Sequence, residues 1–218
     1  MDAFEQLAAE IFRGQGYWVR SGFKVELTRD DKQQIGLPSC PRWELDLIAY
    51  RPAARELLVL ECKSYLDSGG VHAAHFTPGA RLAGRYKLFN SPSLRTTVLN
   101  RLRHQLAAAG LCLDDVDLRL GLVYAHATEF NEALLKKRFA AEQWCLFGPD
   151  FLRFHLRKLA SGPYENSTAA VVAKILLRQQ SPDDPNGCDE AAIEPELSMP
   201  AADPRPRPVC IPSHAQEA

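Results

Sequence analysis

The sequence lacks three features that would place it quickly in a class. No apolar run approaches the roughly 18 residues that a membrane-spanning helix needs, so no membrane span is expected. The six cysteines form no CxxC pair, which argues against a structural zinc site. No Gly-rich phosphate-binding loop is evident, which disfavours a hydrolase of small nucleotides.

The net charge is small but unevenly distributed along the chain. Residues 179–218 carry eight acids and two bases, a net of −6 against −1 for the whole chain, which leaves +5 for residues 1–178. This segment is dense in proline and has no Phe, Trp or Tyr, so we predict a disordered acidic tail. A mildly basic body is compatible with nucleic-acid binding without requiring it. The acidic, amphipathic start "MDAFEQLAAEIF" is unlike a secretory signal, and a cytoplasmic location is the default expectation.

Apolar periodicity predicts alternating helices and strands. A helix is expected from about Ala3 to Arg13, followed by a strand in "YWVRSGFKVEL" with a candidate bulge at Gly22. The short link "RPAAR" predicts an antiparallel hairpin between strands at 43–50 and 56–64. Further elements are predicted after a long loop, in this order: a helix at 94–109, a strand at 116–125, a helix in "EFNEALLKKRFAAEQ", a short strand "WCLF" and helices at 150–160 and 165–178. This order predicts an α/β fold with a mixed central sheet and extra C-terminal helices.

Charged residues interrupt the two best strand-forming runs. Glu61 and Lys63 are two residues apart, so they share one face of their strand, and hairpin pairing can bring Asp46 beside Glu61. Two neighbouring carboxylates repel each other unless a proton or a cation intervenes. Mg²⁺ prefers such oxygen ligands, and Lys63 can orient an attacking water and offset transition-state charge. These parts suit metal-dependent phosphodiester hydrolysis.

The pattern of Asp46, fourteen intervening residues and then Glu61-Cys62-Lys63 resembles the PD-(D/E)XK nuclease superfamily. The preceding helix "FEQLAAEIFRGQGYWV" is similar to that of its Mrr-like and Holliday-junction-resolvase-like branches, although Leu45 replaces the proline of the motif. The resemblance covers roughly residues 3–125. It implies a restriction-endonuclease-like αβββαβ core.

The resemblance also implies roles for individual residues. Asp46 and Glu61 would bind Mg²⁺ or Mn²⁺, Glu5 would join them, and Lys63 would be catalytic. Glu5 has a structural alternative as the third residue of a capping box with Asp2. A structural salt-bridge cluster, or a decayed site, is the alternative for the whole group. The residues that would contact a nucleic-acid backbone are Arg81, Arg85, Lys87 and Arg101, with plain solvation as their alternative.

Two other groups invite a functional interpretation that we do not favour. The triplet Asp30-Asp31-Lys32 repeats the acid-x-lysine pattern, but it lies in a polar stretch without strand character. His72 and His75 have the spacing of a metal-ligand pair, yet no cysteine lies nearby in their Gly-rich loop.

The sequence therefore predicts a metal-dependent endonuclease, with DNA as the expected substrate, acting in defence or repair. The alternative is a catalytically inactive module of the same fold that binds nucleic acid or a protein partner. A homodimer is compatible with the first hypothesis, because cutting both strands of a duplex needs two active sites or two binding events. The expected organisation is a nuclease-like core at 1–125, an α/β extension packed on it at 126–178 and the tail at 179–218.

Overall fold

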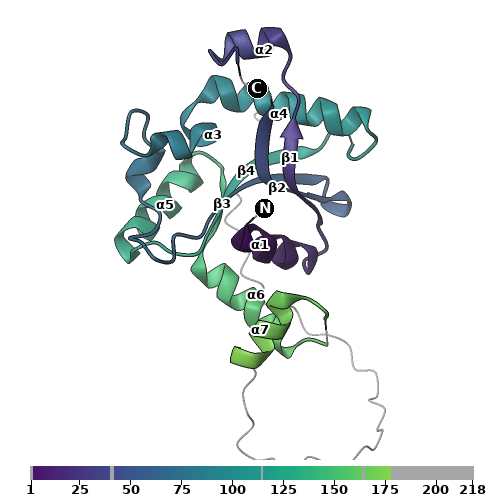
Figure 1. Cartoon of the computed structure of the whole chain (residues 1–218), viewed down its shortest axis with the longest axis vertical. Coiled ribbons are helices and arrows are strands. Elements are labelled where there is room, and N and C mark those ends of the chain that lie inside the picture. The colour runs from purple at the N-terminus through teal and green to yellow at the C-terminus, as the bar shows by residue number, and fades with distance from the viewer. Residues whose placement is uncertain (1, 40–41, 114, 164, 178–218) are drawn as a thin grey trace, which may run out of the picture. The chain divides into compact units, whose positions relative to one another are not determined.

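A computed structural model describes residues 2–39, 42–113, 115–163 and 165–177 (Figure 1). The predicted tail, residues 179–218, lies outside the described residues. Within the described part, residues up to His155 belong to one compact unit and those from Leu156 onward to a second.

Five strands and seven α-helices are found among the described residues. The strands are β1 (Trp18–Val25), β2 (Trp43–Arg51), β3 (Glu56–Lys63), β4 (Asp117–Tyr124) and β5 (Cys145–Phe147). The helices are α1 (Ala3–Arg13), α2 (Arg29–Gln34), α3 (Lys87–Asn90), α4 (Pro92–Ala108), α5 (Glu129–Ala141), α6 (Pro149–Ser161) and α7 (Thr168–Leu177). The predicted α/β class and the helices after β5 are confirmed. The long connection after β3 is not a plain loop, because it contains α3 and 3₁₀ turns at Ala73–Phe76 and Ala83–Arg85.

The five strands form one mixed sheet in the order β1-β2-β3-β4-β5. The first three strands are antiparallel, whereas β3, β4 and β5 run parallel. Strand β5 pairs with β4 and covers its edge, so the sheet continues past the boundary predicted at residue 125. The unit that contains this sheet extends to His155.

Two hydrophobic clusters cover the two faces of the sheet, and Figure 1 shows α1 and α4 on different sides of it. On one face α1 and the start of α6 pack against Leu47, Leu58 and Leu60 of the central strands. On the other face α3, α4 and α5 pack against Ile48 and Val59. The central strands are therefore covered on both faces, whereas the edge strand β1 keeps exposed side chains along its length.

Strands β1 and β2 change the face that they present to the core at Gly22 and Asp46. Leu47 packs with α1, whereas Leu45 packs on the opposite face, although a regular strand places residues two apart on one face. Phe23 lies opposite Leu45 and the register on both sides of Gly22 is continuous, so the candidate bulge has no inserted residue and that prediction is wrong. Gly22 instead adopts a φ of +60°, which glycine tolerates without a steric cost.

Candidate functional site

The site begins where strands β2 and β3 stop pairing. The last paired residues are Leu47 and Leu60, so Asp46 and Glu61 would form the next pair. Instead, a carboxylate oxygen of Asp46 (Oδ2) accepts a hydrogen bond from the backbone N–H of Cys62 at 2.8 Å. The Asp46 side chain thus replaces a backbone hydrogen bond of the sheet. This local separation makes room for the side chains of Glu61 and Lys63.

The Lys63 ammonium lies where three oxygens from two strands converge. Its Nζ is 2.5 Å from Glu61 Oε1 and 3.8 Å from Asp46 Oδ2. It also donates to the backbone oxygen of Cys62 at 3.1 Å. The structure therefore brings together the three residues that the sequence pattern singled out. Their side chains are 18 to 24% exposed, so the group is sheltered but open to solvent.

The pKa values of Glu61 and Lys63 are both shifted by their surroundings in the site. Burial raises the pKa of Glu61, the charge of Asp46 raises it further, and Lys63 only partly opposes this. Burial lowers the pKa of Lys63, but the charge and hydrogen bond of Glu61 and the charge of Asp46 outweigh it, so the pKa is raised overall. Lys63 therefore stays positively charged at neutral pH. It can orient a water molecule or offset negative charge, but it cannot accept a proton as a base.

Glu5 forms the predicted capping box and also lies close enough to Asp46 to feel its charge. The Asp2 side chain accepts from the Glu5 backbone N–H at 2.8 Å and the Glu5 carboxylate accepts from the Asp2 N–H, so the capping box of α1 is confirmed. The pKa of Glu5 is raised by burial first and then by the charge of Asp46. Helix α1 therefore presents a third carboxylate to the two on the sheet.

These residues line an open cleft of about 370 Å³, which we call the acidic cleft. The residues that line it are Asp2, Glu5, Asp46, Cys62, Lys63, Ser64, Tyr65 and Arg85. A regular strand through Ser64 would point that side chain away from the site, but β3 ends at Lys63. Tyr65 has a φ of +43°, which turns the chain at the cleft. The "DSGG" turn sequence that follows is the only sequence signal for this change.

The four predicted nucleic-acid contacts are not all found at the acidic cleft. Arg85 is exposed and lines the acidic cleft, where it donates to the hydroxyl of Tyr65 at 3.2 Å. The Lys87 ammonium lies over the ring of Trp43, and Arg81 is exposed on the loop before Arg85. Arg101 instead forms an ion pair with Asp31. Only Arg85 of the four lines the acidic cleft.

Arg101 and the second acid-x-lysine triplet form a structural contact between α4 and α2. The Nε of Arg101 lies 2.5 Å from Asp31 Oδ2, and its Nη2 lies 3.2 Å from Asp31 Oδ1. The hydrogen bond from Arg101 is the main reason that the pKa of Asp31 is lowered. Asp31 also caps α2 through Thr28, so this triplet serves a helix terminus.

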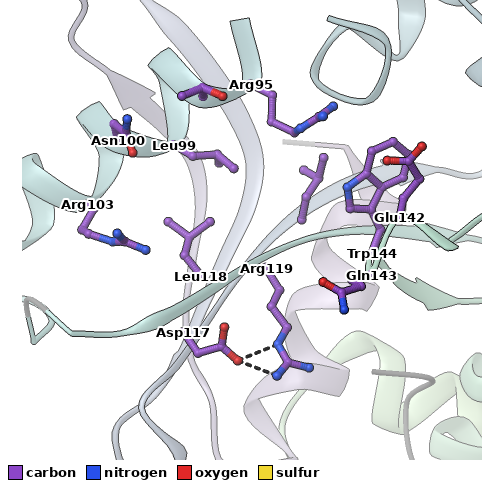
Figure 2. A pocket seen from close by; sticks show the side chains of 12 residues that line it. Arg95, Leu99, Asn100, Arg103, Asp117, Leu118, Arg119, Glu142, Gln143 and Trp144 are labelled. Atoms are coloured by element: carbon purple, nitrogen blue, oxygen red, sulfur yellow. Dashed lines mark hydrogen bonds and ion pairs between the residues drawn. The ribbon is translucent and has the colours of Figure 1, made fainter. Parts of the chain in front are cut away.

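A larger cavity, of about 410 Å³, lies toward the start of β4, at the opposite end of this strand from Tyr124, which is aligned with Lys63 (Figure 2). Figure 2 shows Arg119 joined to Asp117 by two dashed contacts, which measure 2.7 and 2.5 Å. Arg95 donates to two backbone oxygens at 3.0 Å, and its guanidinium lies 5.1 Å from the centroid of the Trp144 ring. Arg95 and Arg119 thus already have partners within the protein. The third arginine of the lining, Arg103, donates from Nη2 to the backbone oxygen of Val116 at 3.4 Å, and its buried Nε makes no hydrogen bond with any described residue.

Comparison with known proteins assigns no class to the chain. No protein-family model, curated protein or solved structure matches it significantly. None of the helices in the described ranges is long and apolar enough to cross a membrane. Within those ranges, no three or more His, Cys, Asp or Glu side chains are grouped as a metal site.

Proposed function

We propose that the chain is a metal-dependent nuclease of the PD-(D/E)XK type that hydrolyses phosphodiester bonds in nucleic acid, with DNA as the expected substrate, in defence or repair. The observation that carries the proposal is the position of the Lys63 ammonium, within 4 Å of carboxylate oxygens from both Asp46 and Glu61. A motif that matches by chance would have no reason to converge at an open strand end. Apart from the short helices α2 and α3, the order of helix, three strands, helix and strand up to β4 also agrees with the core of that superfamily.

The donor atoms of the site fit Mg²⁺ or Mn²⁺. Two carboxylates and the Cys62 carbonyl supply hard oxygen ligands, and Mg²⁺ commonly keeps several waters beside one or two carboxylates. Glu5 would add a third carboxylate from α1. The pKa values of Glu61 and Glu5 are raised first by burial and then by the charge of Asp46, a repulsion that a divalent ion between the carboxylates would relieve. A bound divalent ion supplies Lewis-acid polarisation of a phosphate oxygen.

The side chains of the site would orient the attacking water, stabilise the developing charge and hold the substrate. Lys63, charged at neutral pH, would orient the attacking water and stabilise charge that develops on the phosphate. Arg85, exposed at the rim of the acidic cleft, would hold the neighbouring phosphodiester backbone. Glu5 and Asp46 would keep the field of the cleft negative enough to attract the ion.

A second candidate function is an inactive module of the same fold that binds nucleic acid or a protein. Two observations favour it: Lys63 already neutralises Glu61 in an ion pair, and the described residues contain no preformed group of three metal-binding side chains. The two candidate functions differ in whether the protein cleaves nucleic acid in a reaction that depends on Mg²⁺ and on Lys63.

The test is cleavage of supercoiled plasmid with Mg²⁺ by the purified chain, by Lys63→Ala and by Lys32→Ala. Lys32 belongs to the chance triplet and is the matched control. We expect Lys63→Ala to lower the rate about 100-fold or more, because removing one transition-state donor costs that much, and Lys32→Ala to cleave like the unmodified chain. Equal cleavage by all three would reject the assigned site. DNA binding without cleavage by any of them would support the inactive module.

A further inference from the structure

A second, smaller cavity adjoins the acidic cleft. It has a volume of about 280 Å³, and Tyr65 and Arg85 line both spaces. We call it the aromatic cavity, and its remaining lining residues are Ser68, Gly69, Gly70, His72, His75 and Leu82. Its size is just below the roughly 300 Å³ at which pockets for drug-sized ligands begin, so it suits a single ring system.

The hydrogen-bond network behind His72 determines which of its ring nitrogens faces the cavity as a donor. The Asn131 side-chain oxygen accepts from the backbone N–H of Ala73 at 3.1 Å, which fixes the orientation of this amide. The amide nitrogen therefore donates to His72 Nδ1, 3.3 Å away. In the neutral ring the proton is then on Nε2. This nitrogen faces Gly69, because a Cβ added there would lie 3.2 Å from it.

The second imidazole of the aromatic cavity, that of His75, favours its neutral form. The ring centroids of His75 and His72 are 5.1 Å apart. The pKa of His75 is lowered by burial and then by the charges of His72 and Arg85, so His75 is neutral. Arg85, the one cation of the lining, lies at the border with the acidic cleft, with its guanidinium 6.0 Å from the centroid of the Tyr65 ring. The lining side chains thus change from charged groups in the acidic cleft to aromatic rings in the aromatic cavity.

Tyr65 sits at this border in an unfavourable backbone conformation. Its φ of +43° is uncommon for any residue other than glycine and is costly for a bulky one. Glycine at this place would remove the strain, but it would also remove the ring. The neighbouring wall has no side chains: Gly70 has a φ of +79°, and a Cβ there would lie 2.5 Å from His126 O.

We propose that the aromatic cavity binds one nucleobase of the strand whose phosphate enters the acidic cleft. The base would stack on the rings of Tyr65 and His72, and the Nε2–H of His72 would donate to an acceptor on its edge. A phosphate is a poorer occupant, because the only cation is at the border. The inference rests on the proposed function, which supplies the strand in the neighbouring cleft.

The test compares two single-stranded oligonucleotides of equal length and charge, oligothymidylate and its fully abasic counterpart. Binding is measured by fluorescence anisotropy in EDTA, so that no cleavage occurs. Because stacking one base contributes an affinity factor of about 10 or more, the unmodified chain should prefer the base-bearing strand by about that factor. Gly69→Val, whose Cβ would lie 3.2 Å from His72 Nε2 and whose methyl groups would fill the space, and His72→Ala should each remove most of this preference.

Both variants should bind the abasic strand as the unmodified chain does, since its contacts are with phosphates alone. Gly14→Ala is the matched control, because a Cβ at Gly14 makes only ordinary contacts at the far end of α1. Circular dichroism checks that each variant folds. If Gly69→Val does not fold, His72→Ala alone provides the test. An unchanged base preference in a folded variant overturns the assignment of the cavity.

Plasmid cleavage by the unmodified chain separates the two proposals. Cleavage without any base preference overturns the aromatic cavity and leaves the nuclease standing. A base preference that the variants lose, with no cleavage by the unmodified chain, overturns the nuclease and keeps the base site. Failure to bind either strand overturns the base site, and plasmid cleavage then decides the nuclease proposal on its own.

Discussion

Asp46 is expected to have two separable roles, and two substitutions distinguish them. Its carboxylate accepts the Cys62 N–H at 2.8 Å, in a part of β3 where Cys62 is only 6% exposed. Asp46→Asn keeps an oxygen acceptor for this N–H, whereas Asp46→Ala leaves the N–H without one. Both remove the negative charge that raises the pKa values of Glu61 and Glu5, so this effect cancels in the comparison.

The difference between the two variants therefore measures the hydrogen bond. An unsatisfied buried N–H costs about 1–3 kcal/mol, so Asp46→Ala should unfold more easily than Asp46→Asn by about 2 kcal/mol. For a chain of this size that corresponds to about 4 to 8 °C in Tm. The unmodified chain and Asp46→Asn should agree within about 1 kcal/mol, because the lost charge on the acceptor is offset by relief of repulsion.

Thermal unfolding followed by circular dichroism at pH 7 measures this difference. Glu44→Ala is the control, since Glu44 is an exposed acid on the same strand and is not among the residues lining the acidic cleft. Under the proposed function both Asp46 variants lose Mg²⁺-dependent cleavage, and a calorimetric titration shows loss of Mg²⁺ or Mn²⁺ uptake. Equal Tm values for the Asn and Ala variants would refute the reasoning, because the carboxylate would then not replace a bond of the sheet.

Two further predictions concern pH. The pKa of Glu61 is raised above its ordinary 4.5, so its stabilising effect is complete below 4.5 and is lost as pH rises through the raised value. The free energy of unfolding of Glu61→Gln relative to that of the unmodified chain should therefore rise with pH above 4.5, with a slope of at most about 1.4 kcal/mol per pH unit. A difference that does not change with pH contradicts this, since Lys63 titrates above the range. The pKa of Asp31 is lowered from 3.8, so the stability from its contact with Arg101 is present above that pH and is lost as pH falls through the lowered value. Arg101→Ala should cost about 0.2–1 kcal/mol at pH 7 and less at pH 2, and urea unfolding that shows the same cost at both would reject the ion pair as its source.

Much of the fold follows from local patterns in the sequence. The apolar stripe and the Asp2–Glu5 capping box predicted α1, and alternation with a short link predicted the β2–β3 hairpin. The convergence of Glu61 and Lys63 followed from the strand period of two. These predictions succeeded because each depends on residues close together in the sequence.

Features that depend on distant segments were not predictable in the same way. The change of faces at Gly22 and Asp46 arises where β2 leaves β3, and it cannot be inferred from either strand alone. A regular strand would place Glu44 on the same face as Asp46, where it could be an extra ligand or simply a surface acid, but it is exposed and is not among the residues lining the acidic cleft. The place of Tyr65 at the cleft depends on its backbone conformation, which no residue preference of tyrosine indicates.

The ion pair between Lys63 and Glu61 has a consequence for the order of events under the proposed function. A divalent metal ion and the Lys63 ammonium would compete for the same carboxylate oxygens. Without a substrate, the lysine therefore weakens binding of the metal ion. An incoming phosphodiester offers the lysine another anion and so frees those oxygens. By thermodynamic reciprocity, Mg²⁺ should then raise the affinity for the nucleic acid by the same factor by which the nucleic acid raises the affinity for Mg²⁺.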